Sequence, residues 1–424
     1  MRHIIKLTNG NIGLPVILTI FFMFAYLGFF NSNNMRIAGV LLVVFVGIAI
    51  YRGKFIIIRT NFSISCYVLL VLGIASAIFL NRATGYKYVT LIILGIFVQN
   101  YPFKKNEYEL ATKAIDIIST IFAVYTIINI FIPEMTINFF GFMLSDLQVD
   151  SIHRYFSYNH GSPGLAGELS YNAICMMLGF SVCLAKILSE RRIRLWVAAR
   201  IILLFYAIFL TTKRSILLIA LLFLFVTLLF LQREYKHVKS WKRIIICGII
   251  IIFLLFIPVA YNFIKYEILY EGGKAIQLSG RQILWKIALD MFHSSPIIGK
   301  GINSYDIHYC KSIGLSYTTF TGAHNSYLQY MAETGIIGLI ALIYMVFTNI
   351  IYTFRCINNN SFFAYFSFFG QLLFILYGFS GNPFYQAQEL FTYFFLISFN
   401  VFFFRNEISK SYTFRRSLPI VLTR

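Results

Sequence analysis

The chain has 424 residues, of which 59% are hydrophobic and 12% are charged, and its net charge is +20. Soluble globular proteins carry about 25% charged residues, so this composition excludes an ordinary soluble enzyme or binding domain. Apolar runs of about 15 to 22 residues recur from end to end, and such runs are long enough to cross a bilayer as helices. The sequence therefore predicts an all-α polytopic membrane protein.

We predict about twelve spans, of which the second and fourth are short. The first apolar run has no convincing cleavage site and is expected to remain as a span. With both termini inside, most of the 36 basic residues fall in inner segments, as the positive-inside rule expects. The net charge is therefore interpreted as a topology signal and not as evidence for a nucleic-acid partner. In chain order the predicted spans are 12–30, 37–51, 62–80, 86–100, 112–132, 166–186, 195–212, 214–231, 243–264, 334–353, 361–380 and 387–404.

Two connections are long, and the topology places both on the outer side. Long ordered loops in a compact fold are usually functional, so we expect the chemistry there. The chain then divides into N-terminal spans (1–132), a first outer loop (133–165), central spans (166–264), a second outer loop (265–333), C-terminal spans (334–404) and a basic cytoplasmic tail (405–424).

The first outer loop and the start of the next span read HRYFSYNHGSPGLAGELSYNA, residues 153–173. Aromatic rings beside polar groups can stack on sugars, but at a membrane interface they are more often simple anchors. The anchor interpretation is favoured here. Glu168 and Asn172 follow at helical i, i+4 spacing.

The second outer loop contains SGRQILWKIALDMFHSSPIIGKGINSY, residues 279–305. Its apolar spacing predicts an amphipathic helix over 281–292 that lies on the membrane surface, with Arg281 in the first turn. Proline and glycine then end the helix. The stretch TGAHNSYLQYMAETG follows and places His324, Asn325, Gln329 and Glu333 before the next span. These polar groups either solvate a helix end or form part of a site.

A tight outer turn, TTKRS, carries Lys213 and Arg214 against the positive-inside trend. Arg214 either snorkels to the membrane surface or serves a site, because ionisable groups at membrane depth are functional candidates. Together with Arg281 it suggests an anion site, since guanidinium groups match phosphate oxygens. Alternatively, Glu168 or Glu333 neutralises the pair internally. The six cysteines are scattered and are expected to be packing residues.

These motifs, in this order, resemble the O-antigen ligase and O-antigen polymerase family of bacterial envelope glycosyltransferases. The family pattern has an SGR-x-x-x-W helix, a P-x-x-G-x-G turn and an HN-x-[YF]-L-x-x-x-x-E-x-G entry to a span. The first half of the chain matches in architecture only. The matching residues are Ser279, Gly280, Arg281, Trp285, Pro296, Gly299, Gly301, His324, Asn325, Tyr327, Leu328, Glu333 and Gly335.

The resemblance implies a GT-C-like enzyme of the bacterial inner membrane, whose active site faces the periplasm. It implies transfer of a glycan from undecaprenyl pyrophosphate to an acceptor hydroxyl, with membrane lipids as surroundings and a chain-length regulator protein as a further candidate partner. His324 is implied to act on the acceptor, and Arg281 and Arg214 to hold the pyrophosphate. Asn325, Gln329, Glu333, Tyr327 and Trp285 are expected to support the site.

These roles agree with the chemistry. Two arginines can stabilise the departing pyrophosphate without a metal or a cofactor, so neither is expected. A histidine with a pKa of about 6.5 suits a general base for a sugar hydroxyl. Direct displacement predicts inversion at the anomeric carbon.

Polymerase is the favoured activity, because the chain looks divergent beyond the core motifs, and the product is O-antigen or capsule. The first alternative is an O-antigen ligase that transfers glycan to lipid A core. An alternative of another class is a transporter or flippase of lipid-linked oligosaccharide, although transporter sites usually lie at the bilayer midplane.

Overall fold

The computed structural model describes residues 59–80, 82–132, 134–140, 149–150, 153, 161–234, 281–314, 322–359 and 361–417. Within these ranges the fold is helical, and no strand occurs in them. The bounds of the helices are α3 Asn61–Phe79, α4 Arg82–Asn100, α5 Lys105–Phe131, α6 Met135–Phe140, η2 Gly164–Ala166, α8 Leu169–Glu190, α9 Leu195–Leu210, α10 Arg214–Glu234, α12 Arg281–Ser294, α13 Tyr305–Ser312, α14 Ser326–Cys356, η4 Ile357–Asn359, α15 Phe362–Tyr377 and α16 Ala387–Ser417.

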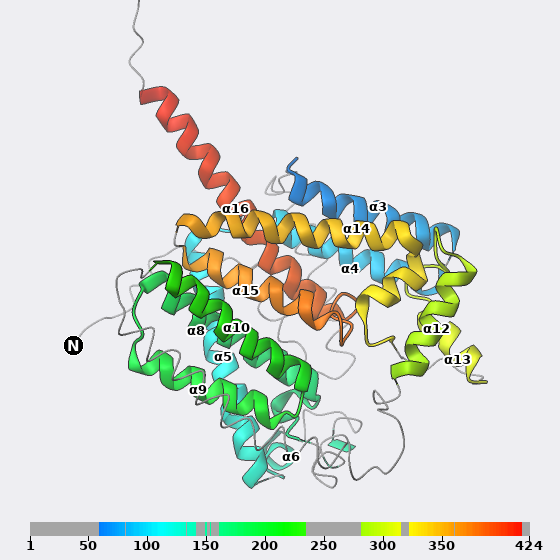
Figure 1. The fold of residues 1–424 in the computed structure, drawn as a ribbon, viewed down its shortest axis with the longest axis horizontal. Helices are drawn as coiled ribbons and strands as arrows, with labels where there is room; N and C mark the ends of the chain where they lie inside the picture. The colour runs from blue at the N-terminus through cyan, green and yellow to red at the C-terminus, as the bar shows by residue number, and fades with distance from the viewer. Residues whose placement is uncertain are drawn as a thin grey trace, which may run out of the picture.

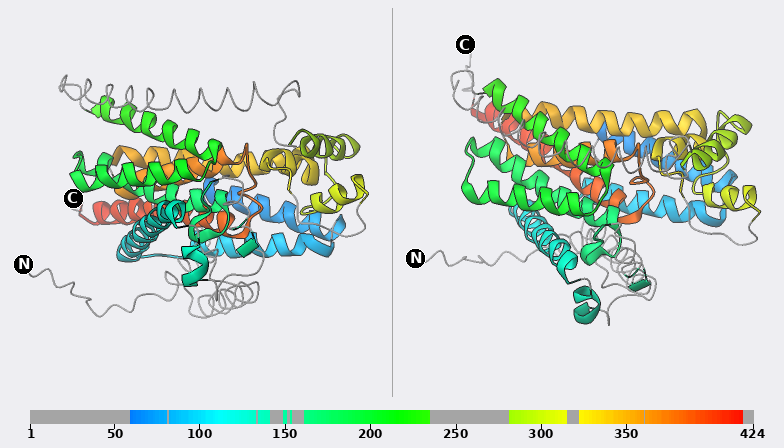
Figure 2. Two further views of the ribbon diagram at one scale, coloured as in Figure 1. Left: turned by 90° about the horizontal axis from the view of Figure 1, so that it is seen from below. Right: turned by 60° about the horizontal axis from the view of Figure 1, so that its bottom comes forward.

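The long helices pack as two groups joined by α15 (Figure 1). One group contains α3, α4, α14 and α16, and the other contains α5, α8, α9 and α10. In both views of Figure 2, the short helices α12 and α13 lie at one end of the bundle. We call this the α12 end. It also holds the turn between α9 and α10 and the start of α14 (Figure 1).

Helices α8 and α16 form the centre of the bundle. Of the most apolar 18-residue window of each, 89% is buried in α8 and 83% in α16, against 28% in α10. Small residues allow the close approach: a Cβ added to Gly179 of α8 would overlap Ser119 of α5, and one added to Gly95 of α4 would overlap the Phe394 ring of α16. Helices in membranes associate through small residues at their interfaces, because the hydrophobic effect contributes little free energy to helix association there.

Six of the described helices are long and apolar enough to span a membrane, namely α3, α5, α8, α10, α14 and α16. This confirms an all-α membrane protein. Helices also occupy the predicted spans 86–100, 195–212 and 361–380, as α4, α9 and α15. The predicted spans 12–30, 37–51 and 243–264 lie outside the described residues, so the number twelve stays a prediction.

Helix α14 starts earlier than the sequence predicted. It begins at Ser326 and not at residue 334, because the Asn325 side chain accepts hydrogen bonds from the backbone N–H groups of Tyr327 and Leu328, each at 3.1 Å, and so caps the helix. The helix then breaks at Gly335, whose φ is 65° and ψ is −167°. The predicted start therefore falls next to a real discontinuity. The predicted amphipathic helix is present as α12, with Ala288 and Met291 buried.

A buried ion cluster lies at the opposite end of the bundle. Asp116 of α5 is 6% exposed and pairs with Lys186 of α8 and Arg200 of α9, each at 2.6 Å. Trp196 lies below both cations, 4.8 Å from the Lys186 nitrogen and 5.9 Å from the Arg200 guanidinium carbon. Five cysteines are buried, as expected of packing residues, and form no disulfide among the described residues: Cys66, Cys175, Cys183, Cys310 and Cys356. Cys247 lies outside the described residues.

Candidate active site

Helices α8, α9 and α10 follow one another in alternating directions, so α8 and α10 both start toward the α12 end, where α14 also starts (Figure 1). Each brings one polar residue at or just before its first turn: Glu168 before α8, Lys213 before α10 and His324 before α14. Arg281 is the first residue of α12, at the same end. Helix N-termini carry a partial positive charge, so their convergence favours an anion.

His324 is held by its neighbours in an unusual backbone conformation. Its φ is 50°, in the left-handed region that non-glycine residues rarely adopt. On its N-terminal side, Ala323 is fixed through both backbone polar groups. The Ala323 N–H donates to Oε1 of Gln329 at 3.0 Å, and the indole N–H of Trp285 donates to the Ala323 carbonyl at 3.1 Å.

The other side of His324 is fixed just as firmly. Asn325 caps α14, as described above. The Ser326 N–H donates to the carbonyls of Gly378 and Gly381 in the turn between α15 and α16, at 2.8 and 3.0 Å. Four hydrogen bonds to residues 323 and 326, from three elements of the fold, therefore fix the backbone on both sides of His324 and so the position of its Cβ atom. Strained backbone that the surroundings over-determine is typical of functional sites.

Desolvation and nearby charges both shift the pKa of the His324 imidazole. The side chain is exposed, yet the surrounding protein lowers the pKa of the imidazole by desolvation, and the charges of Arg281 and Lys213 lower it further. Glu168 opposes them and raises the pKa. At neutral pH the lowered pKa favours the neutral imidazole, which is the form that can accept a proton.

Lys213 and Glu168 form the second half of this arrangement. The Lys213 ammonium lies 3.8 Å from Oε1 of Glu168. Burial lowers the pKa of Lys213, Glu168 raises it, and Arg281 lowers it again. Glu168 also caps α8, since its carboxylate oxygens accept from the N–H groups of Ser170 at 3.0 Å and Tyr171 at 2.6 Å. We call His324, Arg281, Lys213 and Glu168 the charged cluster.

Of the two arginines proposed from sequence, the structure brings one to His324. Arg281, half-buried, belongs to the charged cluster. Arg214 lies exposed at the first residue of α10, and Lys213 is the residue of that turn that influences His324. The sequence signal for Lys213 was the same one that singled out Arg214, namely a basic residue in a short outer turn.

Glu333 is fully buried and holds a loop. Its carboxylate accepts from the backbone N–H groups of Asn303 at 2.7 Å and Tyr305 at 2.9 Å, and from the Gln329 side chain at 3.2 Å. The sequence left open whether Glu333 orients the site or pairs with an arginine. These bonds favour orientation: Gln329 joins Glu333 to Ala323, and thereby to His324.

The turn at residues 296–301 explains two glycines of the motif. The N–H groups of Lys300 and Gly301 donate to the carbonyls of Ala332 and Glu333, and the Ile336 N–H donates to the Pro296 carbonyl at 2.9 Å. A Cβ on Gly299 would overlap the Glu333 backbone, and one on Gly335 would overlap the Ile297 backbone. Both positions therefore require glycine because two backbones touch.

The remaining predicted residue, Tyr327, packs into the bundle. Its hydroxyl donates to the Ile375 carbonyl at 2.8 Å, and its ring lies 4.6 Å from that of Phe379. These contacts fix the start of α14 against α15 and the turn after it.

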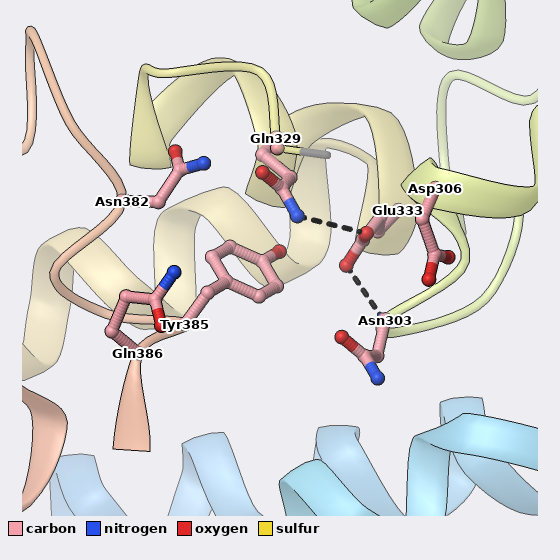
Figure 3. Close-up of a pocket in the computed structure, with 8 residues that line it drawn as sticks. Asn303, Asp306, Gln329, Glu333, Asn382, Tyr385 and Gln386 are labelled. Atoms are coloured by element: carbon pink, nitrogen blue, oxygen red, sulfur yellow. Dashed lines mark hydrogen bonds between the residues drawn. The ribbon is translucent and has the colours of Figure 1, made fainter. Parts of the chain in front are cut away.

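A polar pocket lies beside the loop that Glu333 holds and is shown in Figure 3. It is lined by Asn303, Asp306, Gly322, Gln329, Glu333, Asn382, Tyr385 and Gln386. Asn382 and Gln386 were missed from sequence, because nothing local marks the turn after α15 as part of the site.

The fold and this cluster define a multi-pass helical membrane protein with a charged site at one end of its bundle. Residues 199–343 match the family model described as O-Antigen ligase, which confirms the resemblance to the O-antigen ligase and polymerase family. This third of the chain contains Lys213, Arg281 and His324.

A second comparison finds a relative of uncharacterised function in Haemophilus influenzae. It is 32% identical over 109 residues, which are 24% of this chain. The aligned segment covers 27% of that relative's length.

Proposed function

We propose that this protein is a polymerase of O-antigen or capsular polysaccharide in the bacterial inner membrane, with its active site facing the periplasm. In this proposal the donor is a glycan on undecaprenyl pyrophosphate, and the acceptor is the terminal sugar hydroxyl of another lipid-linked repeat unit. The charged cluster is the observation that carries the proposal. It combines a base that is neutral at physiological pH with two cations, Arg281 and Lys213, of which Lys213 lies 3.8 Å from the carboxylate of Glu168.

The reaction follows from these groups. The neutral imidazole of His324 takes the proton of the acceptor hydroxyl as its oxygen attacks the anomeric carbon of the donor. The bond from that carbon to the pyrophosphate oxygen breaks, and the lipid pyrophosphate leaves with the electron pair. Arg281 and Lys213 stabilise the charge that develops on it, and the convergent helix N-termini add to this. Attack from the face opposite the leaving group inverts the anomeric centre.

The proposal changes one assignment made from sequence. Lys213 takes the place given to Arg214 as the nearer cation of the turn, and Arg214 remains a candidate for the outer phosphate. Both can contact a pyrophosphate, because phosphate is bound by lysine as a point charge and by arginine as a fork.

A ligase is the second candidate, because the matching family model bears that description. A ligase would use the same donor chemistry but would transfer the finished glycan to lipid A core. A chain-length regulator would be a partner only of the polymerase.

The test replaces His324, Arg281 and Lys213 singly by alanine in the native strain and resolves the surface glycan by gel. His293→Ala is the matched control, since His293 is an exposed histidine at the end of α12. A polymerase predicts that His324→Ala leaves single repeats on the lipid A core. Attached glycan that disappears while lipid-linked polymer accumulates would instead identify a ligase. Normal ladders from all three variants, at wild-type protein levels, would overturn the proposal.

A further inference from the structure

The pocket in Figure 3 has a chemistry different from that of the charged cluster. The described residues that line it contribute amides, a phenol and two carboxylates, and no basic side chain. Its enclosed space is about 20 Å³, enough for one water-sized group such as a single sugar hydroxyl, and its mouth opens to solvent. A pyrophosphate would meet Glu333 and Asp306 there, so the pocket does not suit the anionic part of the donor.

Amide side chains converge on this pocket from different parts of the fold. Asn382 and Gln386 come from the turn before α16, Gln329 comes from α14, and Asn303 comes from the loop before α13 (Figure 3). The amide oxygen of Asn382 is buried and accepts no hydrogen bond from the described part of the chain. A buried polar atom without a partner costs free energy, so this open oxygen is a position at which a ligand hydroxyl can donate a hydrogen bond.

The hydrogen bonds of Glu333 help to decide between two classes of ligand for the pocket, a metal cation and a neutral hydroxyl group. Hydrogen bonds from Asn303, Tyr305 and Gln329 already take three of the roughly four acceptor positions of the Glu333 carboxylate. The described residues also contain no group of three or more side chains that could hold a metal ion, so a cation is disfavoured. Neutral hydroxyl groups both donate and accept, and side-chain amides are suited to bind them. The ring of Tyr385 is buried and packs 5.2 Å from the rings of Tyr88 and Tyr330, so it forms a fixed wall of the pocket.

The pocket is connected to His324 through the backbone. Gly322 lines the pocket two residues before His324, and a Cβ there would overlap the Asn382 amide. Gln329 also lines the pocket and binds the Ala323 N–H. The groups that shift the pKa of His324 are instead Arg281, Lys213 and Glu168. Gly322, at the start of the segment 322–324, therefore lines a pocket suited to neutral hydroxyl groups. His324, at its end, lies among charged groups suited to an anion.

We propose that the pocket lined by Asn382, Gln386, Tyr385 and Asn303 binds a hydroxyl-bearing part of the acceptor sugar and so helps to select which hydroxyl reaches His324. This inference rests on the proposed function and adds the place of the acceptor to it. Asn382 and Gln386 are specificity-determining residues in this scheme, and they leave donor binding to Arg281 and Lys213.

The experiment uses the full-length protein in lipid nanodiscs with lipid-linked repeat unit as donor. The acceptor probe is the repeat-unit oligosaccharide released by mild acid from the strain's own surface glycan. Asn382→Ala and Gln386→Ala are compared with wild type and with Asn406→Ala, an exposed amide at the far end of α16. Each pocket variant should raise KM for the acceptor by about 2- to 10-fold, the loss expected for one neutral hydrogen bond, while KM for the donor stays unchanged.

A second readout keeps the two proposals apart. Saturation-transfer NMR measures binding of the same oligosaccharide without any reaction, and the signal should weaken in both pocket variants only. Wild-type kinetics and NMR signal in both variants, or equal rises in both KM values, would overturn the pocket while leaving the proposed function standing. If the wild-type protein transfers nothing, the proposed function fails, and the NMR comparison alone then decides whether the pocket binds sugar.

Discussion

The carboxylate of Glu168 lies 3.8 Å from the ammonium of Lys213 while it also caps the first turn of α8. One acid thus fixes a helix start and balances one of two cations beside His324. The protonation of His324 therefore depends on two residues that are distant from it in sequence, because Glu168 raises the pKa of the imidazole and Lys213 lowers it.

We expect Glu168→Gln and Lys213→Gln to shift the pH profile in opposite directions. Loss of the Glu168 charge removes the influence that raises the pKa of His324, so the acid limb of kcat/KM should move to lower pH. Loss of the Lys213 charge removes an influence that lowers this pKa, so the limb should move to higher pH. Shifts in the same direction, measured as transfer rate against pH, would contradict the electrostatic assignment.

Trp285→Phe tests whether the backbone around His324 is held in place. The variant loses the indole hydrogen bond to the Ala323 carbonyl, which should lower kcat by about 2- to 10-fold. Donor KM should stay unchanged, because Arg281 and Lys213 are still present. The matched control is Trp196→Phe at the opposite end of the bundle, which should retain wild-type kcat. Loss of donor binding in Trp285→Phe would indicate a general collapse of the site.

Gly335→Ala and Gly314→Ala separate backbone contact from backbone conformation. Both glycines have positive φ, 65° and 73°, but a Cβ on Gly335 overlaps Ile297, while one on Gly314 meets no atom of the described residues within 4 Å. Gly314→Ala should cost about 1 kcal/mol, and Gly335→Ala about 3 kcal/mol or more. The measurement is the melting temperature in detergent. Equal losses would mean that the close contact between the two backbones contributes little.

Asp116→Asn should destabilise the protein far from the site. Lys186 and Arg200 are 22% and 20% exposed, and without the Asp116 charge two half-buried cations would face each other. The expected loss is about 3 kcal/mol, the lower end for breaking a buried pair, because water still reaches both cations. Glu109→Gln, which breaks the exposed pair with Lys105, should change the melting temperature little. A small effect of Asp116→Asn would show that solvent screens the cluster.

The sequence predicted the helices better than it predicted the contacts between them. Apolar periodicity found the spans, because hydrophobic length is a local property. It also placed His324 and Arg281 among the candidate residues. It singled out Arg214, whereas Lys213 is the residue of that turn whose charge lowers the pKa of His324, because which of two adjacent residues faces His324 depends on where α10 begins. The role of Arg214 in binding the pyrophosphate stays a prediction.

Roles within the motif were also hidden in the sequence. Asn325 turned out to be a helix cap, and Glu333 holds the backbone of residues 303 and 305. The backbone partners of Glu333, at Asn303 and Tyr305, lie 30 and 28 residues away, so i, i+4 reasoning reaches only its contact with Gln329. The pocket residues Asn382 and Gln386 lie still farther along the chain, so only the packing of α16 against the bundle reveals them.

The break at Gly335 divides α14 at a depth that matters for a lipid substrate. At 1.5 Å per residue, residues 336–356 extend about 32 Å, close to the hydrocarbon thickness of about 30 Å. If residues 336–356 make the crossing, Ser326–Thr334 is left over for the headgroup layer. His324 precedes this short segment, so its imidazole would then lie near the level of the phospholipid phosphates. A carrier lipid could present its pyrophosphate there without leaving the bilayer.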